Sequence, residues 1–247
     1  MVRQFTFALI TLVTVVVSNL ALAKIKDDDF VSAISPTAPG FTIPNAHWIS
    51  DEKILRSNSP LSSEHVAQLK SHHISKVLVF KAFSDPKIKE KLSSLYRANG
   101  FQKQDVKWIN FPWQNIHDYH RACEQTVEAL KYIKENENSG VAFHCTVGED
   151  RTGLLAGILR QARDGWSKDK AFKEEMCARG YADGSIAKDE YAKIQIHKAL
   201  TPLFDYLSSA VASKSLQWNA LNSNVCDDIN SRIALTKGRY HWCELHN

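Results

Sequence analysis

Short apolar runs alternate along the chain with segments of helical spacing, and this alternation predicts the fold class. Residues 76–80 (KVLVF) form a compact apolar run typical of a buried strand, and residues 106–111 (VKWINF) alternate as a strand does. Weaker strand patterns cover residues 53–55 and 141–143. Because helical segments separate these strands, we predict an α/β fold with a central, mostly parallel sheet flanked by helices.

Helical spacing recurs between and after these strands. Asp85 and Pro86 carry the signal of a helix start, and Gly140 stands at or just past the end of another helix. The segment after the last strand is apolar, which indicates a helix buried in the core. The predicted helices cover residues 61–71, 85–99, 119–135, 152–162 and 166–179, followed by a helical pair over residues 186–212.

The first residues have the pattern of an export signal. Arg3 precedes an apolar segment, residues 7–17 (FALITLVTVVV), and residues 21–23 (ALA) form a small-x-small cleavage site. We predict a signal peptide over residues 1–23 and a periplasmic or secreted protein. The alternative is an uncleaved anchor, for which residues 5–23 are barely long enough. No second long apolar run follows, so we expect no stable membrane insertion after cleavage.

The composition is that of an ordinary globular protein, with 44% hydrophobic and 23% charged residues. The net charge of +4 is mild and evenly spread, without a Lys/Arg block, so nothing indicates a nucleic-acid partner. A mixed segment with three prolines, residues 24–47, indicates an N-terminal arm, and the polar residues 213–247 indicate an irregular C-terminal extension. One folded domain remains over residues 48–212, and we expect a monomer.

Export changes the interpretation of the five cysteines, because disulfides form in oxidising compartments. Cys226 and Cys243 lie in the same C-terminal segment, and we predict a disulfide between them. Cys123 lies on the apolar face of a predicted helix, where we expect a buried thiol. An odd number leaves at least one cysteine free or paired with another chain, and Cys177 has no assignment.

The stretch VAFHCTVGEDRTG, residues 141–153, connects a strand to an apolar helix and carries the candidate chemistry. Its loop, residues 145–151, is called the cradle loop below. A loop of this kind presents backbone N–H groups at a helix N-terminus, which binds anions, and Gly148 permits the backbone angles of a tight turn. The planar guanidinium of Arg151 matches two phosphate oxygens. Together with the helix N-terminus and its N–H groups, it favours the thiolate form of Cys145. The residues therefore predict a nucleophile beside an oxyanion site, suited to attack on phosphorus.

His144-Cys145, five residues and Arg151-Thr152 resemble the signature loop of the cysteine-dependent protein tyrosine phosphatase superfamily. The longer form HCTVGEDRTG is similar to its bacterial dual-specificity/tyrosine phosphatase-like branch. The resemblance implies the fold of that family and makes residues 48–212 a phosphatase domain. Two alternatives are a buried Cys145 with Arg151 in a surface ion pair, and a zinc site at His144-Cys145, for which no second Cys/His pair has ligand spacing.

The resemblance implies a role for each residue of the loop. Cys145 forms a phosphocysteine intermediate, Arg151 binds the phosphoryl oxygens, and the Thr152 hydroxyl stabilises the thiolate as it leaves. His144 organises the loop through hydrogen bonds. The reaction needs no metal and no cofactor. The loop groups that bind the substrate are those of Thr146, Val147, Gly148, Glu149, Asp150 and Arg151.

The family takes the proton for the leaving oxygen from an Asp on an upstream loop. Here that loop is residues 111–118 (FPWQNIHD), and its Asp118 precedes Cys145 by 27 positions. We predict Asp118 as the general acid, with a helix N-cap as the alternative role and Asp105 as a second candidate acid. His117-Asp118 is also similar to a metal phosphohydrolase dyad, but companion ligands are lacking.

Glu149 bears on the substrate, because lipid-directed relatives carry Lys at that loop position. A Glu there repels a multiply phosphorylated ligand, unless its side chain points to solvent. Asp150 is expected to orient Arg151 or fix the loop, and Arg56 is expected to support the site or touch the substrate, with a surface ion pair as its alternative.

Three functions follow from this reasoning. The first is a phosphatase acting on phosphotyrosine, with phosphoserine and phosphothreonine as further substrates. The second is a phosphoinositide or inositol phosphate phosphatase. The third is a phosphate-binding module without catalysis. The expected partner is a phosphorylated protein or a small phosphomonoester.

Overall fold

A five-stranded sheet forms the centre of this computed structural model, with the strand order β1-β2-β5-β3-β4. β1 pairs with β2 in antiparallel direction, and all other neighbours are parallel, which confirms the predicted fold class. The structure describes residues 31–50, 52–83, 85–112, 115–185, 187–235 and 242–243, so the predicted signal peptide lies outside it. The strands are β1 (His47–Ser50), β2 (Ile54–Ser57), β3 (Lys76–Phe80), β4 (Val106–Ile109) and β5 (Val141–His144).

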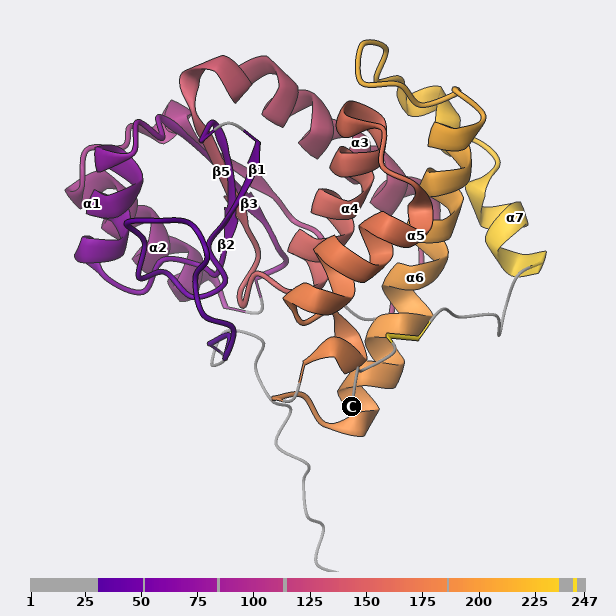
Figure 1. Ribbon diagram of the computed structural model, residues 1–247, viewed down its shortest axis with the longest axis horizontal. Helices are drawn as coiled ribbons and strands as arrows, with labels where there is room; N and C mark the ends of the chain where they lie inside the picture. The colour runs from indigo at the N-terminus through magenta and orange to yellow at the C-terminus, as the bar shows by residue number, and fades with distance from the viewer. Residues whose placement is uncertain are drawn as a thin grey trace, which may run out of the picture.

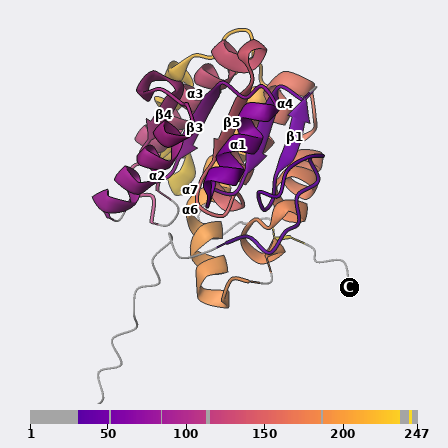
Figure 2. The ribbon, with the colours of Figure 1, turned by 90° about the vertical axis from the view of Figure 1, so that its left-hand side faces the viewer.

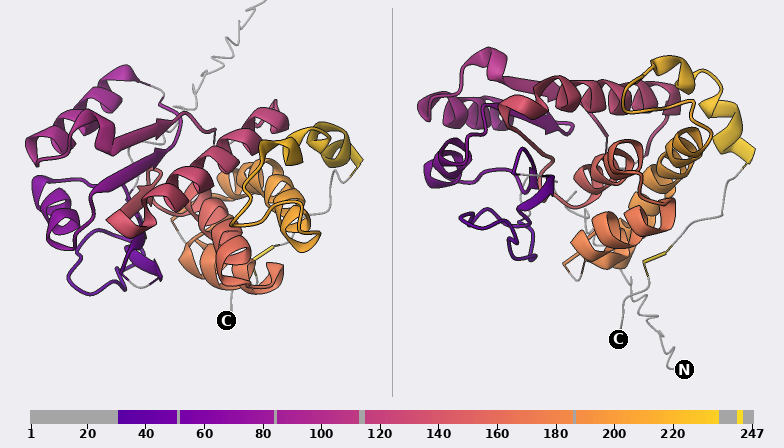
Figure 3. Two further views of the ribbon diagram at one scale, coloured as in Figure 1. Left: turned by 90° about the horizontal axis from the view of Figure 1, so that it is seen from above. Right: turned by 45° about the horizontal axis from the view of Figure 1, so that its top comes forward.

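Helices cover both faces of the sheet. In Figure 1, α1 and α2 lie on one side of the strands, and α3, α4 and α6 lie on the other. Figure 2 and Figure 3 show the same layers from other directions. The α-helices are α1 (Ser63–Ser71), α2 (Pro86–Ala98), α3 (Tyr119–Asn136), α4 (Asp150–Asp164), α5 (Lys168–Lys170), α6 (Glu190–Ala212) and α7 (Ile229–Leu235). The shorter segments are η2 (Lys103–Asp105), η3 (Glu137–Ser139), η4 (Ala171–Met176), η5 (Cys177–Arg179), η6 (Ala182–Gly184) and η7 (Ser223–Cys226).

The alternation of side chains along the strands divides the core into two layers. Leu55 and Val77 pack with the residues of α1 and α2, whereas Leu78 and Phe143 pack with those of α3, α4 and α6. All four residues of β5 are buried, because this strand lies in the middle of the sheet and is covered on both faces. The carboxyl end of β5, where the cradle loop begins, is therefore held from every side.

Several predicted elements differ from the structure. β1 was not predicted, because its four residues (HWIS) are only partly buried at the sheet edge and carry no clear alternation. The helical pair over residues 186–212 is one helix, α6, which contains Pro202. The continuous helix over residues 166–179 is divided into α5, the π-helical segment η4 and η5. Tertiary contacts decide such boundaries, which sequence periodicity does not mark.

The predicted disulfide between Cys226 and Cys243 is wrong. Cys123 is bonded to Cys226 and Cys177 to Cys243, with Cα–Cα distances of 5.7 and 5.4 Å. Closeness along the chain did not select the partners, because η7 packs against α3 and the chain then returns to η5. Cys123 does lie in the core, but as a half-cystine. All five cysteines are among the described residues, and Cys145 is the free one.

The described part of the C-terminal segment contains more regular structure than its polar composition suggested. It contains η7 and α7, and Ile229 and Ile233 join the same core layer as α3 and α6. The ring of Trp242 packs against that of His197, with 4.4 Å between centroids. Among the described helices, none combines the length and apolar character needed to cross a bilayer.

Candidate active site

The cradle loop lies at the carboxyl edge of the sheet. β5 pairs with β2 through Ser57 and His144 and with β3 through Val79 and His144, so Cys145 directly follows the central strand. α4 begins at Asp150, and residues 144–153 are all buried. A parallel sheet gathers its ligand-binding loops at this edge, and the α4 N-terminus adds its positive dipole there.

Hydrogen bonds fix Cys145 and Arg151 within the loop. The Cys145 N–H donates to Thr152 Oγ1 over 2.8 Å, and only 1% of Cys145 is exposed. Arg151 Nη2 donates to Thr146 Oγ1 over 3.3 Å, and Arg151 is 2% exposed. Arg151 is therefore not part of a surface ion pair, and it lies on the same short loop as the thiol.

The backbone carbonyls of the loop are bound from outside it. His144 Nδ1 lies 2.7 Å from the Cys145 oxygen, and the Ser59 N–H donates to the Thr146 oxygen over 2.8 Å. Because the C=O and N–H of a trans peptide point in opposite directions, these bonds turn the next N–H groups, of Thr146 and Val147, toward the inside of the loop. The loop therefore has the amide orientation that an anion requires.

Arg56 fixes the next carbonyl. Its Nη2 donates to the Gly148 oxygen over 2.7 Å, and Asn45 Nδ2 donates to the same oxygen over 3.1 Å. Arg56 Nη1 binds both the backbone oxygen of Glu175 and its Oε2, the latter over 3.2 Å. Arg56 is 0% exposed, so the alternative of a surface ion pair is wrong. Its contacts with protein groups on both sides make it a support of the loop.

Glu175 carries the charge that makes a buried Arg56 possible. Its Oε1 accepts a hydrogen bond from Arg160 Nε over 2.7 Å. Burial opposes its ionisation, but the hydrogen bond with His47 and the charges of Arg56 and Arg160 lower the pKa of Glu175 to about 2. The carboxylate is therefore ionised at any pH at which the protein is expected to work.

Gly148 is required by both backbone angle and space. Its φ is +71°, in the left-handed region. A Cβ atom there would lie 2.4 Å from the carbonyl oxygen of Ser57 and 2.6 Å from the backbone nitrogen of Asn58. The cradle loop therefore packs directly against the chain that follows β2.

His144 is a neutral hydrogen-bonding residue. Its Nδ1 faces a carbonyl oxygen, which only accepts, so Nδ1 carries the proton, and Nε2 accepts from Tyr96 OH over 2.7 Å. Burial, with the charges of Lys81 and Arg151, lowers the pKa of His144 to about 4, against the effect of the bond to Cys145 O. Both ring nitrogens are engaged by protein groups, which agrees with a loop-organising role and leaves neither for zinc.

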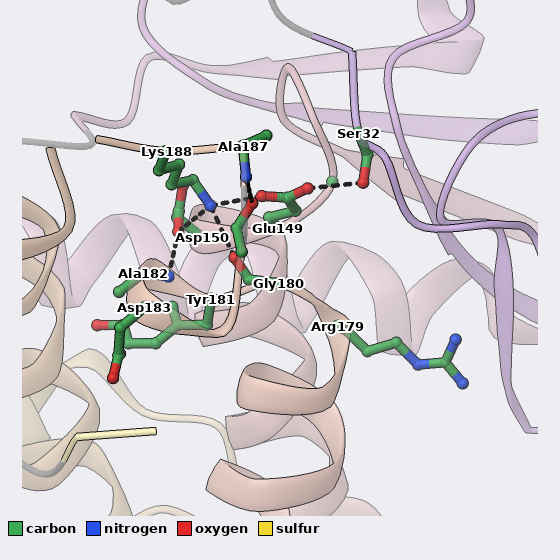
Figure 4. A network of polar contacts seen from close by, with 12 residues as sticks. Ser32, Glu149, Asp150, Arg179, Gly180, Tyr181, Ala182, Asp183, Ala187 and Lys188 are labelled. Atoms are coloured by element: carbon green, nitrogen blue, oxygen red, sulfur yellow. Dashed lines mark hydrogen bonds and ion pairs between the residues drawn. The ribbon is translucent and has the colours of Figure 1, made fainter. Parts of the chain in front are cut away.

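Glu149 and Asp150 point away from the solvent and toward Lys188 (Figure 4). Lys188 Nζ lies 2.5 Å from Glu149 Oε2 and 3.0 Å from Asp150 Oδ1. Glu149 Oε1 accepts from Ser32 Oγ over 2.6 Å, and Asp150 Oδ1 accepts from the Ala182 N–H over 2.9 Å. The alternative that Glu149 points to solvent is wrong, because it is 2% exposed. Asp150 fixes the loop to η6.

Asp118 is exposed and caps α3. Its side chain accepts from the Arg121 N–H over 3.1 Å. This bond, with further help from Asn230, lowers the pKa of Asp118. The capping alternative is thus observed, whereas the role of general acid stays a prediction. The other candidate, Asp105, pairs with Lys76 over 2.7 Å on a different part of the surface of the fold, beside the amino end of β3.

Three residues of the site carried little or no signal in the sequence. Glu175 and Lys188 lie in segments whose pattern is only helical or loop-like, and Ser32 belongs to the N-terminal arm. Arg56 had a signal, since it is a charged residue inside the strand ILRS. A charge in a buried strand needs a partner, so its position indicates a role even before the partner is known.

Comparison with known proteins identifies the relatives of the chain. A model described as the tyrosine phosphatase family matches residues 40–174. The dual specificity protein phosphatase TpbA of Pseudomonas aeruginosa (strain UCBPP-PA14) is 33% identical over 72 residues, which cover 29% of this chain and 33% of TpbA. The chain is therefore aligned with only a third of the length of that relative.

Two solved structures match much of the chain. The crystal structure of P. aeruginosa TpbA has 24% identity and a TM-score of 0.44, and the match covers 71% of this chain and 98% of that one. The core catalytic domain of the PP-IP phosphatase SIW14 from S. cerevisiae, in complex with citrate, has 19% identity and a TM-score of 0.46, with 85% and 100% covered.

Replacing Gly148 tests the close packing of the cradle loop. We expect Gly148→Ala to lower the free energy of unfolding by about 3 kcal/mol, because a strained backbone angle and a steric contact add together. Gly165→Ala is the matched control: its φ is +69°, but nothing lies within 4 Å of the added Cβ, so the angle alone acts. Urea unfolding measures both. Equal losses for the two variants would show that the loop has room at Gly148.

The pKa of His144 predicts a pH-dependent stability. In the unfolded state His144 takes up a proton below its usual pKa of about 6.5, whereas in the folded state its pKa is about 4. Stability from this group is therefore complete above pH 6.5 and decreases as the pH falls, by about 3 kcal/mol at pH 4. We expect His144→Asn to remove this part of the slope in urea unfolding between pH 7 and pH 4, and the exposed His73→Asn to keep it. An unchanged slope in His144→Asn would contradict the assignment.

Proposed function

The chain belongs to the tyrosine phosphatase family, and on that premise we propose that it hydrolyses phosphomonoesters through a phosphocysteine intermediate. The observation that carries the proposal is the cradle loop. The Cys145 N–H binds Thr152 in the first turn of α4, three loop carbonyls are bound from outside, and Arg151 donates to Thr146. These groups form a site for a tetrahedral anion with a nucleophile at its base.

In the first step, the Cys145 thiolate attacks phosphorus. The bond between phosphorus and the ester oxygen breaks, and the leaving oxygen takes up a proton. Negative charge spreads over the remaining phosphoryl oxygens, where the inward N–H groups and Arg151 stabilise it. No acyl or metal-bound species is needed for this displacement.

In the second step, water attacks phosphorus, the bond to sulfur breaks, and inorganic phosphate leaves. The sulfur departs as a thiolate and benefits from a hydrogen bond. Thr152 Oγ1 already accepts from the Cys145 N–H, so its own proton is available to the sulfur. The Thr152 hydroxyl therefore accepts from the backbone N–H of Cys145 and donates to its sulfur.

We propose Asp118 as the group that donates the proton in the first step and accepts one from water in the second. Its bond to the Arg121 N–H lowers the pKa of Asp118 when no substrate is bound. A phosphate dianion near the carboxylate acts in the opposite direction, since a like charge disfavours ionisation. Capping and proton transfer are therefore compatible in one residue.

We propose phosphotyrosine in proteins as the preferred substrate. Cys145 is 1% exposed, so the phosphate must project far from the chain that carries it, as an aryl phosphate does. Glu149 and Asp150 share one lysine, so this side of the loop has no surplus positive charge for additional phosphates. The phosphoinositide alternative requires such a surplus.

We also propose that the protein is exported and acts in the periplasm or outside the cell. The residue pattern of the first 23 positions supports this, and so do the two disulfides, which are typical of oxidising compartments. Because the other four cysteines are paired, the chain has no second thiol that could form a disulfide with Cys145.

Turnover by wild-type protein and a Cys145→Ser variant tests the proposed function. We expect wild type to hydrolyse p-nitrophenyl phosphate and Cys145→Ser to have no measurable turnover, because a serine hydroxyl is not ionised at neutral pH. A panel of phosphotyrosine, phosphoserine and phosphothreonine peptides and of phosphoinositides should give the highest kcat/KM for phosphotyrosine. Full activity in Cys145→Ser would contradict the mechanism, and a preference for phosphoinositides would select the alternative substrate.

Asp118→Asn separates proton transfer from capping, because Asn caps helices as well as Asp does. We expect unchanged stability but a roughly hundredfold lower kcat with phenyl phosphate, whose leaving group needs a proton. The loss should be much smaller with p-nitrophenyl phosphate, whose leaving group is stable as an anion. Asp118→Ala, as the matched variant, should lose both capping and proton transfer. Wild-type turnover of phenyl phosphate by Asp118→Asn would exclude Asp118 as the acid.

A further inference from the structure

Two adjacent carboxylates lie in the loop that is proposed to bind a phosphate dianion. Glu149 and Asp150 are 2% and 3% exposed, so water does not screen them well. Left uncompensated, both charges would oppose an anion in the cradle loop. The way in which the fold compensates their charge therefore affects phosphate binding.

One lysine from a distant part of the chain meets both carboxylates. Lys188 Nζ is within 3.0 Å of oxygen atoms of Glu149 and Asp150 and donates to the Gly180 oxygen over 2.7 Å. Its three donors thus have three acceptors. Burial opposes its charge, but Asp150 and Glu149 raise the pKa of Lys188, so it remains an ammonium ion.

The same network joins three segments that are far apart in the sequence. Figure 4 shows Ser32 from the N-terminal arm on one side of Glu149 and Lys188 on the other. Ala182, from η6, binds Asp150. A Cβ on Gly180 would lie 2.7 Å from Glu149 Cδ, so the segment packs tightly on this side chain. The carboxylates therefore have defined positions, set by Ser32, Lys188 and Ala182.

We propose that Lys188 is a positioning residue of the active site, which offsets one of the two negative charges of Glu149 and Asp150 and fixes the position of both carboxylates. It does so from outside the cradle loop and without touching the substrate. The proposal rests on the proposed function, since it assigns the lysine to the same anion site. It also explains how a loop with two consecutive acidic residues can bind an anion.

The test compares phosphate binding by Lys188 variants, using isothermal titration calorimetry with inorganic phosphate at low ionic strength. We expect Lys188→Met to weaken phosphate binding about tenfold, because one more uncompensated negative charge then acts on the anion. Lys188→Arg should keep most of the affinity. Lys198→Met, which removes an exposed lysine from α6, should behave as wild type.

A second substitution distinguishes charge from mere packing. Glu149→Gln in the Lys188→Met background removes one carboxylate and restores the net charge that the three side chains have in the wild type, so we expect most of the lost affinity to return. In turnover of p-nitrophenyl phosphate the change should appear in KM, with kcat largely kept, because the phosphate charge is present in both ground and transition states. A purely structural lysine would give no such recovery.

Three outcomes would overturn the proposal: wild-type affinity in folded Lys188→Met, no recovery in the double variant, or a loss in kcat alone. If Lys188→Met does not fold, Lys188→Gln keeps a donor without the charge and carries the same expectation. Phosphate binding needs no turnover. A wild-type protein that binds phosphate but hydrolyses nothing would therefore contradict the proposed function, and the phosphate affinities of the Lys188 variants could still be compared.

Discussion

The buried ion pair between Arg56 and Glu175 is the interaction on which the geometry of the cradle loop depends. Arg56 comes from β2 and Glu175 from η4, and the guanidinium spans from that carboxylate to the Gly148 oxygen. Burying two charges costs free energy unless their partners are complete, so removing either one leaves an uncompensated charge in the core. The pair therefore holds sheet, loop and helical layer in one relative position.

The loop is ordered from outside so that its inside can bind an anion. Carbonyl oxygens of Cys145, Thr146 and Gly148 each accept a hydrogen bond from a neighbouring element. Because peptide units are planar, orienting the carbonyls also orients the amides. No reorganisation of the loop is then required when an anion binds there, which is the condition for electrostatic stabilisation by preorganised groups. His144 contributes to this order as a neutral donor, through the tautomer that its two partners impose.

Segments far from the cradle loop along the chain also take part in the site. The N-terminal arm provides Ser32 and Asn45, and the segment after η5 provides Lys188. The disulfide between Cys177 and Cys243 fixes the described end of the chain next to Tyr181, whose oxygen lies 3.5 Å from Cys243 Sγ. Cys145 is therefore the free thiol of a chain whose other four cysteines form disulfides.

The sequence alone predicts the fold class, most element positions and the place of Cys145 and Arg151 on one loop, because these depend on local patterns: apolar runs, helical spacing and the spacing between residues. It did not determine the disulfide partners, the direction of Glu149 or the partners of Arg56. Those depend on which distant segments meet, and a charged side chain has the same local pattern whether it faces water or a buried lysine. Only the tertiary structure brought Lys188 to Glu149 and Cys226 to Cys123, since packing of the helices on the sheet decides which residues are close in space.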